Sequence, residues 1–267
     1  MMKYFFKHKT QVEQKLNARA LLLFLDFDLT LSPLARNPSH AFLPVSTKNV
    51  LKEISAHIPV VVITGRKLSD IKKRVGIKNL IYIGNHGLEH EKSGIAKSTP
   101  LSILSKNGLK EIKKKFLNLA RKYPGVLVEE KKFTLALHYR LLPRENKSAF
   151  MADVKKIRPS LKKHGLRGSF DKKTFDVRPD TKTDKGTACL WVLKTIQNKS
   201  PKRIIPIYIG DGKTDEDAFR ALPNGITVRV GKSQRSLANY YVSNRKEVYK
   251  FLLWIESLLV VNKKALK

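Results

Sequence analysis

Short apolar runs alternate with helix-like segments along most of the chain, and this alternation limits the folds it can adopt. The runs are rich in Val and Ile and end at Gly, Asp or Thr, as is typical of buried parallel strands. Strands are predicted over residues 21–26, 59–63, 80–84, 204–209 and 226–230. Helices are predicted over residues 46–57, 66–75, 185–198 and 214–221. Strands that alternate with helices indicate an α/β fold with a Rossmann-like, doubly wound parallel sheet.

The middle of the chain breaks this alternation. Its pattern predicts helices over 101–122 and 145–164 and strands over 126–130, 133–141 and 167–171. The FTLALHYR segment (133–140) alternates apolar and polar residues, as a half-exposed antiparallel strand does. We therefore expect an α+β domain over residues 95–173, inserted into a core formed by residues 1–94 and 174–267. A strand over 174–178 is expected to lead back to the core sheet.

Four polar segments stand at strand ends or at the start of a helix. They are DFDLT at 26–30, TGR at 64–66, TDKG at 183–186 and GDGKTDED at 210–217. The last segment holds four of the 22 acidic residues of the chain within seven positions, which suggests cation binding. Ligands of doubly wound sheets bind at the carboxyl ends of the strands. The sequence therefore predicts that these segments form one site.

These residue types provide what phosphoryl transfer requires. Carboxylates from separate strands suit Mg²⁺, which prefers oxygen ligands. Asp26 can attack phosphorus as a nucleophile, since carboxylates form aspartyl-phosphates. Asp28 can protonate the leaving oxygen and then deprotonate water. Thr64 and Lys185 can hold the phosphoryl oxygens and offset their developing negative charge.

The four segments, in this order, resemble those of the haloacid dehalogenase-like phosphohydrolases. Longer stretches resemble the trehalose-6-phosphate phosphatase family over about residues 20–230. These stretches are LDFDLTLSPLARNP, VVITGR, IGNHGLE, TLALHYR, FDVRP followed by DKG, and IGDGKTDEDAF. The resemblance implies a haloacid dehalogenase-like core with an inserted α+β cap domain. It also implies Mg²⁺-dependent hydrolysis of trehalose 6-phosphate, a step of trehalose biosynthesis, through an aspartyl-phosphate.

The resemblance also implies residue roles. Asp26 would be the nucleophile and Asp28 the general acid and base, while Thr64 and Lys185 would bind the phosphoryl group. Mg²⁺ would be held by Asp26, the backbone carbonyl of Asp28 and Asp211, with support from Asp215. Two positions depart from the family pattern: Leu29 replaces the usual glycine, and Gly212 replaces a second acidic residue beside Asp211.

A further set of polar residues could contact the substrate. It comprises Arg66, Asn85, His86, Glu89, His138, Arg140, Asp176 and Arg178. Arginine suits bidentate contact with phosphate, so Arg140 or Arg178 could close over the substrate. The alternative is that the polar residues of the inserted domain only pair with one another, and that His86 is structural.

The chain is strongly basic, with 54 Lys and Arg against 22 Asp and Glu and a formal net charge of +32. Such a surface attracts anions in general. The lysines lie in short scattered runs without a nucleic-acid-binding motif, so we expect a small-molecule sugar phosphate as partner rather than nucleic acid. No signal peptide or membrane span is recognisable, and a cytoplasmic monomer is expected. Two alternatives stay open: a phosphatase for another sugar phosphate, and a basic binding module on a degenerate phosphatase fold.

Overall fold

The computed structural model describes residues 2–16, 19–34, 40–92, 95–98, 102–131, 133–171 and 173–264. The chain divides into two compact units. The core unit contains Met1–Lys97 and Thr183–Lys267, and the inserted unit contains Ser98–Lys182. Each unit has its own sheet and its own hydrophobic core.

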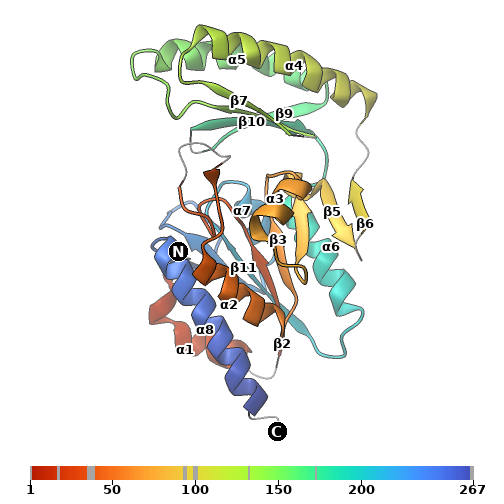
Figure 1. Ribbon diagram of the computed structural model, residues 1–267, viewed down its shortest axis with the longest axis vertical. Helices are drawn as coiled ribbons and strands as arrows, with labels where there is room; N and C mark the ends of the chain where they lie inside the picture. The colour runs from red at the N-terminus through yellow and green to blue at the C-terminus, as the bar shows by residue number, and fades with distance from the viewer. Residues whose placement is uncertain are drawn as a thin grey trace. The chain divides into compact units, whose positions relative to one another are not determined.

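The core unit contains a nine-stranded sheet with the order β1-β13-β12-β11-β2-β3-β4-β5-β6 (Figure 1). The strands are β1 (Lys3–Tyr4), β2 (Ala20–Leu25), β3 (Val60–Ile63), β4 (Ile81–Gly84), β5 (Glu89–Lys92), β6 (Ile95–Ser98), β11 (Ile204–Gly210), β12 (Ile226–Val230) and β13 (Tyr240–Val242). Every pairing from β1 to β4 in this order is parallel, and β5 is antiparallel to β4. This sheet confirms the predicted parallel α/β fold.

Helices cover both faces of this sheet. They are α1 (Lys9–Leu16), α2 (Val45–Ser55), α3 (Leu68–Val75), α6 (Lys185–Gln197), α7 (Asp215–Ala221) and α8 (Arg245–Lys264), with short 3₁₀ helices η1 (Phe5–Lys7) and η3 (Asn85–Gly87). Alternate residues of β2 point to opposite faces: Leu23 and Leu25 pack with α1, α2, α3 and α8, whereas Leu22 and Phe24 pack with α6 and α7. Burial on both faces explains the continuous apolar run in this strand.

The order in which strands are added reverses at the centre of the sheet, although the strands there run parallel. From β2 the sheet grows through β3 and β4 on one side, and the later strands β11 and β12 lie on the other side. The switch point therefore falls between β2 and β11, which pair in parallel. Ligand sites of open α/β sheets lie at such a point, beyond the carboxyl ends of the strands.

The inserted unit is a four-stranded antiparallel sheet with the order β7-β8-β10-β9 and two helices. Its elements are α4 (Ile103–Lys122), β7 (Leu127–Glu130), β8 (Leu135–His138), α5 (Lys147–Lys163), β9 (Leu166–Asp171) and β10 (Thr174–Pro179). Phe116 of α4 and Phe150 of α5 pack against the buried side chains Leu137 and Phe175 of the sheet. Both helices thus cover one face of this sheet (Figure 1).

The position of strand β10 corrects one prediction. Residues 174–178 were predicted to belong to the core and to lead back to its sheet, but β10 pairs antiparallel with β8 and β9 in the inserted unit. Its side chains alternate between buried and half-buried, as expected for a strand with one covered face. The inserted unit therefore extends to Lys182 instead of ending at residue 173.

Among the described residues, none of the helices combines the length and the apolar composition that a membrane span requires.

Candidate active site

Three aspartates meet where strands β2 and β11 end. Asp26 follows β2, Asp211 follows β11, and Asp215 is the first residue of α7. One carboxylate oxygen of each lies within 4.8 Å of the other two, and all three residues are buried. The structure thus brings together two of the predicted metal ligands and the predicted supporting residue. Their roles as ligands stay a prediction.

Asp215 is held against the backbone of the loop that follows β11. Its Oδ2 accepts hydrogen bonds from the backbone N–H groups of Asp211 (3.1 Å) and Gly212 (2.7 Å). Gly210 leaves room for this carboxylate, because a Cβ atom there would lie only 2.4 Å from Asp215 Cγ. Tyr208 also donates its hydroxyl to Asp215 Oδ1 at 2.6 Å. Gly212 therefore still donates its backbone N–H to Asp215, although it lacks the acidic side chain that is usual in the family.

Lys185 lies between two of these carboxylates. It is the first residue of α6, whose N-terminus is closed by a capping box between Asp184 and Thr187. Its Nζ donates to Asp26 Oδ1 at 2.6 Å and to Asp215 Oδ1 at 2.7 Å, and its side chain is only 2% exposed. Burial lowers the pKa of Lys185, but Asp215 and Asp26 outweigh this and raise the pKa above its usual value. Lys185 is therefore protonated in the folded protein.

Asp26 is held on both carboxylate oxygens. Lys185 contacts Oδ1, and the Thr30 hydroxyl donates to Oδ2 at 3.0 Å. Burial raises the pKa of Asp26 to about 7, Lys185 opposes this rise, and Asp215 adds to it. A nucleophilic carboxylate needs to be ionised, so a further positive charge beside Asp26 would favour the reactive form.

The charges in this cluster fit a divalent cation. Three buried carboxylates lie together with one ammonium group, that of Lys185, which contacts Asp26 and Asp215. Burying several negative charges together is costly, and a bound cation would offset that cost. Carboxylate oxygens are the ligands that Mg²⁺ prefers. The residues present at the ends of β2 and β11 thus fit the predicted Mg²⁺.

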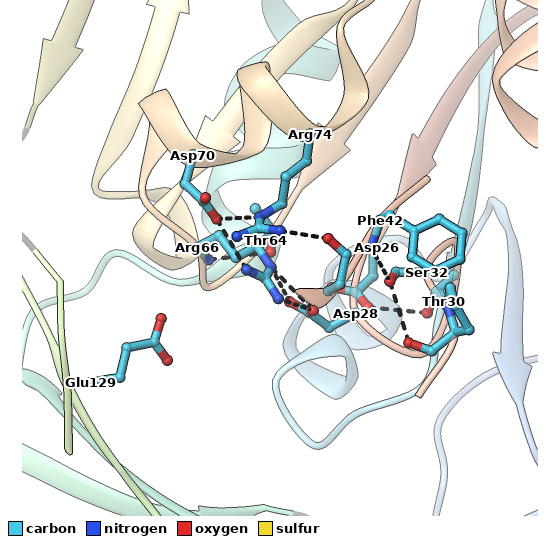
Figure 2. A network of polar contacts seen from close by, with 12 residues as sticks. Asp26, Asp28, Thr30, Ser32, Phe42, Thr64, Arg66, Asp70, Arg74 and Glu129 are labelled. Carbon is cyan, nitrogen blue, oxygen red and sulfur yellow. Dashed lines mark hydrogen bonds and ion pairs between the residues drawn. The ribbon is translucent and has the colours of Figure 1, made fainter. Parts of the chain in front are cut away.

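Asp28, the predicted acid and base, pairs with Arg66 (Figure 2). Arg66 Nη2 lies 2.6 Å from Asp28 Oδ1, and Arg66 Nε lies 2.9 Å from Asp28 Oδ2. The Asp28 side chain is 45% exposed, whereas that of Arg66 is 6% exposed. Arg66 was predicted to contact substrate. In the structure its guanidinium contacts the predicted acid and base, and substrate contact by Arg66 stays a prediction.

Thr64 follows β3 and starts the TGR loop. Its backbone N–H donates to the carbonyl of Ile83 on the neighbouring strand β4 (3.0 Å). Its hydroxyl oxygen accepts from the Arg66 backbone N–H at 3.2 Å. Thr64 is buried, and its predicted contact with the phosphoryl group stays a prediction.

Asn85, His86 and Glu89 connect the segment after β4 to the TGR loop. The Asn85 side chain and the Leu68 backbone N–H both donate to Glu89 Oε2, at 2.5 and 3.0 Å, so Glu89 satisfies a donor at the start of α3. The His86 ring lies against Gly65, where a Cβ atom would be 2.6 Å from the imidazole. These contacts stabilise the loops, and sugar binding by these three residues stays a prediction.

The four predicted residues of the inserted unit lie on or beside β8 and β10. Asp176 and Arg178 alternate with the buried Phe175 and Val177 along β10, so both lie on the face that α4 and α5 do not cover. His138 ends β8, and its ring nitrogens contact Glu129 Oε2 (2.9 Å) and Thr174 Oγ1 (3.1 Å). Arg140 follows two residues later. Substrate contact by all four stays a prediction.

Three contacts around this site were not predicted from the sequence. Thr30 contacts Asp26, Tyr208 contacts Asp215, and Asp70 pairs with Arg66 at 3.0 Å. The spacing of four between Arg66 and Asp70, within the helix predicted over residues 66–75, was an available signal for the last pair. Leu29 has a φ of 65°, in the left-handed region that favours glycine. This conformation explains why glycine is usual at the position.

Comparisons with known proteins agree on one family. The family model described as Trehalose-phosphatase matches residues 24–247. The trehalose-phosphate phosphatase of Mycobacterium tuberculosis (strain H37Rv) is 34% identical over 222 residues, which cover 80% of this chain and 54% of that protein. Trehalose-phosphate phosphatase B of Arabidopsis thaliana is 30% identical over 247 residues, covering 88% and 66%. The chain thus spans about half the length of the mycobacterial relative.

A solved structure shows the same fold. The C-terminal domain of Candida albicans trehalose-6-phosphate phosphatase superposes with a TM-score of 0.84. The match covers 96% of this chain and 98% of that one, at 20% sequence identity.

Proposed function

Because the chain belongs to the trehalose-phosphatase family, we propose that it is a Mg²⁺-dependent phosphatase that hydrolyses trehalose 6-phosphate to trehalose and phosphate. The observation that carries this proposal is the buried cluster of Asp26, Lys185, Asp211 and Asp215. It supplies a nucleophile, a fixed ammonium group and a set of cation ligands at the switch point of the sheet.

In the first step, a carboxylate oxygen of Asp26 forms a bond to phosphorus while the bond from phosphorus to the sugar oxygen breaks. The carboxyl group of Asp28 donates its proton to this leaving oxygen, which departs as the sugar hydroxyl. Lys185 and the Thr30 hydroxyl hold Asp26 in one orientation, so little reorganisation is required for attack. The product of this step is an aspartyl-phosphate on Asp26.

In the second step, water attacks phosphorus and the bond from phosphorus to the Asp26 oxygen breaks. Asp28, now a carboxylate, accepts a proton from the water, and Asp26 is regenerated. Lys185 and Thr64 would offset charge on the phosphoryl oxygens in both steps. Mg²⁺, held by Asp26, Asp211 and the Asp28 carbonyl with support from Asp215, would neutralise further negative charge on the phosphoryl group.

The direct test is phosphate release from trehalose 6-phosphate by the purified protein. We expect release with Mg²⁺, loss of release with excess EDTA, and loss of at least about 1,000-fold in kcat for Asp26→Asn, because the nucleophile is removed. Asp153→Asn is the matched control: Asp153 accepts hydrogen bonds from Lys122 and Tyr123 in the inserted unit, and this variant should retain activity. Robust turnover by Asp26→Asn would contradict the mechanism.

The substrate requires a separate comparison. A panel with trehalose 6-phosphate and the phosphates of glucosyl-glycerate and mannosyl-glycerate should rank trehalose 6-phosphate first by kcat/KM. If another sugar phosphate ranks first, the reaction class stands and the substrate assignment is wrong.

The net charge of +32 motivates the remaining alternative, a basic module that binds nucleic acid or anionic surfaces. The assembled cluster around Asp26 argues against it, because a binding module has no need of a buried nucleophile and its ligands. Tight, salt-sensitive DNA binding together with no phosphatase activity would favour the module.

A further inference from the structure

A chain of ion pairs leads away from the predicted acid and base, Asp28. Arg66 donates to Asp28 through Nε and Nη2, and to Asp70 Oδ2 through Nη1 at 3.0 Å. Asp70 Oδ2 also accepts from Arg74 Nε at 2.8 Å, and Arg74 donates to the backbone carbonyl of Ala41. Figure 2 shows Asp28, Arg66, Asp70 and Arg74 in this order. We call these four residues the Asp28 relay.

Exposure differs sharply along the Asp28 relay. The Arg66 side chain is 6% exposed and its guanidinium lies 5.5 Å from the centre of the Phe27 ring, so it is fixed on several sides. The Asp28 side chain is the most exposed of the four, at 45%. Arg66 precedes α3 and Asp70 lies in its first turn, whereas Asp28 follows β2. Asp28 is therefore the least enclosed residue of the relay.

We propose that Asp70, held by Arg74, is a positioning residue that fixes Arg66 and remains its anionic partner. Asp28 can then leave Arg66 to reach the leaving oxygen. This inference rests on the proposed function, in which Asp28 donates a proton to that oxygen.

The second carboxylate is what makes such a movement feasible. If Asp28 turned away, the buried guanidinium of Arg66 would lose the charge compensation that Asp28 provides, and loss of compensation at a buried charge is strongly unfavourable. Because Asp70 contacts a different nitrogen of Arg66, that pair persists when Asp28 moves. Burial raises the pKa of Asp70, but Arg74 and Arg66 outweigh this and lower the pKa below its usual value. Asp70 therefore remains an anion.

Two substrates separate positioning of Asp28 from general stability. Without a proton, the leaving group of trehalose 6-phosphate would be an unstable alkoxide, so its oxygen needs a proton as the bond to phosphorus breaks. The leaving group of p-nitrophenyl phosphate is stable as an anion and needs none. The parameter kcat/KM covers the steps up to formation of the aspartyl-phosphate. A defect in the placement of Asp28 should thus lower kcat/KM for the sugar phosphate much more than for p-nitrophenyl phosphate.

The experiment compares wild type, Asp70→Asn and Asp70→Glu with both substrates in the full chain. General acid catalysis contributes about 100- to 10,000-fold, so imperfect placement in Asp70→Asn is expected to lower kcat/KM for trehalose 6-phosphate by about 10-fold or more. For p-nitrophenyl phosphate we expect a loss below about 3-fold. Asp70→Glu restores the charge and should recover part of the loss.

Glu247→Gln is the matched control. Glu247 accepts hydrogen bonds from the Tyr4 hydroxyl (2.9 Å) and the Ser243 backbone N–H (2.7 Å), elsewhere in the core unit. This variant loses the same charge as Asp70→Asn, and it should change kcat/KM for both substrates by the same factor. If Asp70→Asn does not fold, Arg74→Gln is measured instead, since it loosens Asp70 without removing either pair of Arg66.

If Asp70→Asn loses kcat/KM equally for both substrates, or loses none, the proposed role of Asp70 is wrong. If the wild type hydrolyses p-nitrophenyl phosphate but not trehalose 6-phosphate, the substrate assignment fails. The same ratio is then measured with the best sugar phosphate of the panel. If the wild type hydrolyses no phosphate ester, the proposed function and this inference both fall.

Discussion

Replacement of Lys185 by Met tests the charge balance of the buried cluster most directly. The substitution keeps an unbranched side chain in the buried position and removes the ammonium that Asp26 and Asp215 share. Removing one partner of a buried ion pair costs about 3–5 kcal/mol, because the remaining charge is left without compensation. Domains of this kind have a free energy of unfolding of about 5–15 kcal/mol. We therefore expect Lys185→Met to lose about a fifth or more of the stability of the core unit.

A surface lysine provides the comparison. Lys72 on α3 pairs with Glu91, and its side chain is 43% exposed. Exposed pairs of this kind contribute about 0–1 kcal/mol. Lys72→Met removes one ammonium from the same unit, so it matches the change in net charge. The difference between Lys185→Met and Lys72→Met is expected to be about 2–5 kcal/mol.

Urea unfolding in EDTA, followed by tryptophan fluorescence, measures this difference. Both tryptophans of the chain, Trp191 in α6 and Trp254 in α8, belong to the core unit, so the signal reports the unit that contains Lys185. The midpoint should fall while the slope with urea stays unchanged. Mg²⁺ should restore part of the loss, since a bound cation compensates the same carboxylates. If Lys185→Met is no less stable than Lys72→Met, the charge argument for the cluster is wrong.

Two further predictions concern Asp26 and Leu29. The folded pKa of Asp26, about 7, exceeds the ordinary aspartate pKa of 3.8, so its contribution to stability is fully present below pH 3.8 and is lost as the pH rises through about 7. In EDTA, the urea midpoint of the wild type should therefore decrease relative to that of Asp26→Asn between pH 5 and pH 7.5, and an increase would contradict this. Leu29→Gly should raise the free energy of unfolding by about 0–1.5 kcal/mol, because relief of the positive φ (about 1–2 kcal/mol) offsets or exceeds the entropy cost of glycine (about 0.5–1 kcal/mol). Leu29→Ala keeps the positive φ, so a gain there equal to that of Leu29→Gly would refute the strain argument.

The sequence by itself determined the central strands of the core sheet and where polar groups follow them. The runs around Leu23, Val62 and Ile207 are apolar on both faces, and this pattern predicts buried parallel strands whatever their order. Polar residues that follow such runs, such as Asp26 and Asp211, must lie at the carboxyl ends of strands. The parallel fold and the meeting of these residues could therefore be predicted from local patterns.

Only the tertiary structure decided which of these groups contact one another. Lys185 reaches Asp26 across 159 positions of sequence, and Arg66 reaches Asp28 across 38, because β2, β3 and α6 are brought together by the sheet and its packing. The alternation in β10 predicted a half-covered strand but could not indicate which sheet it joins. The sheet that β10 joins depends on hydrogen bonds to strands distant in the sequence, and a local pattern of residues does not encode these pairings.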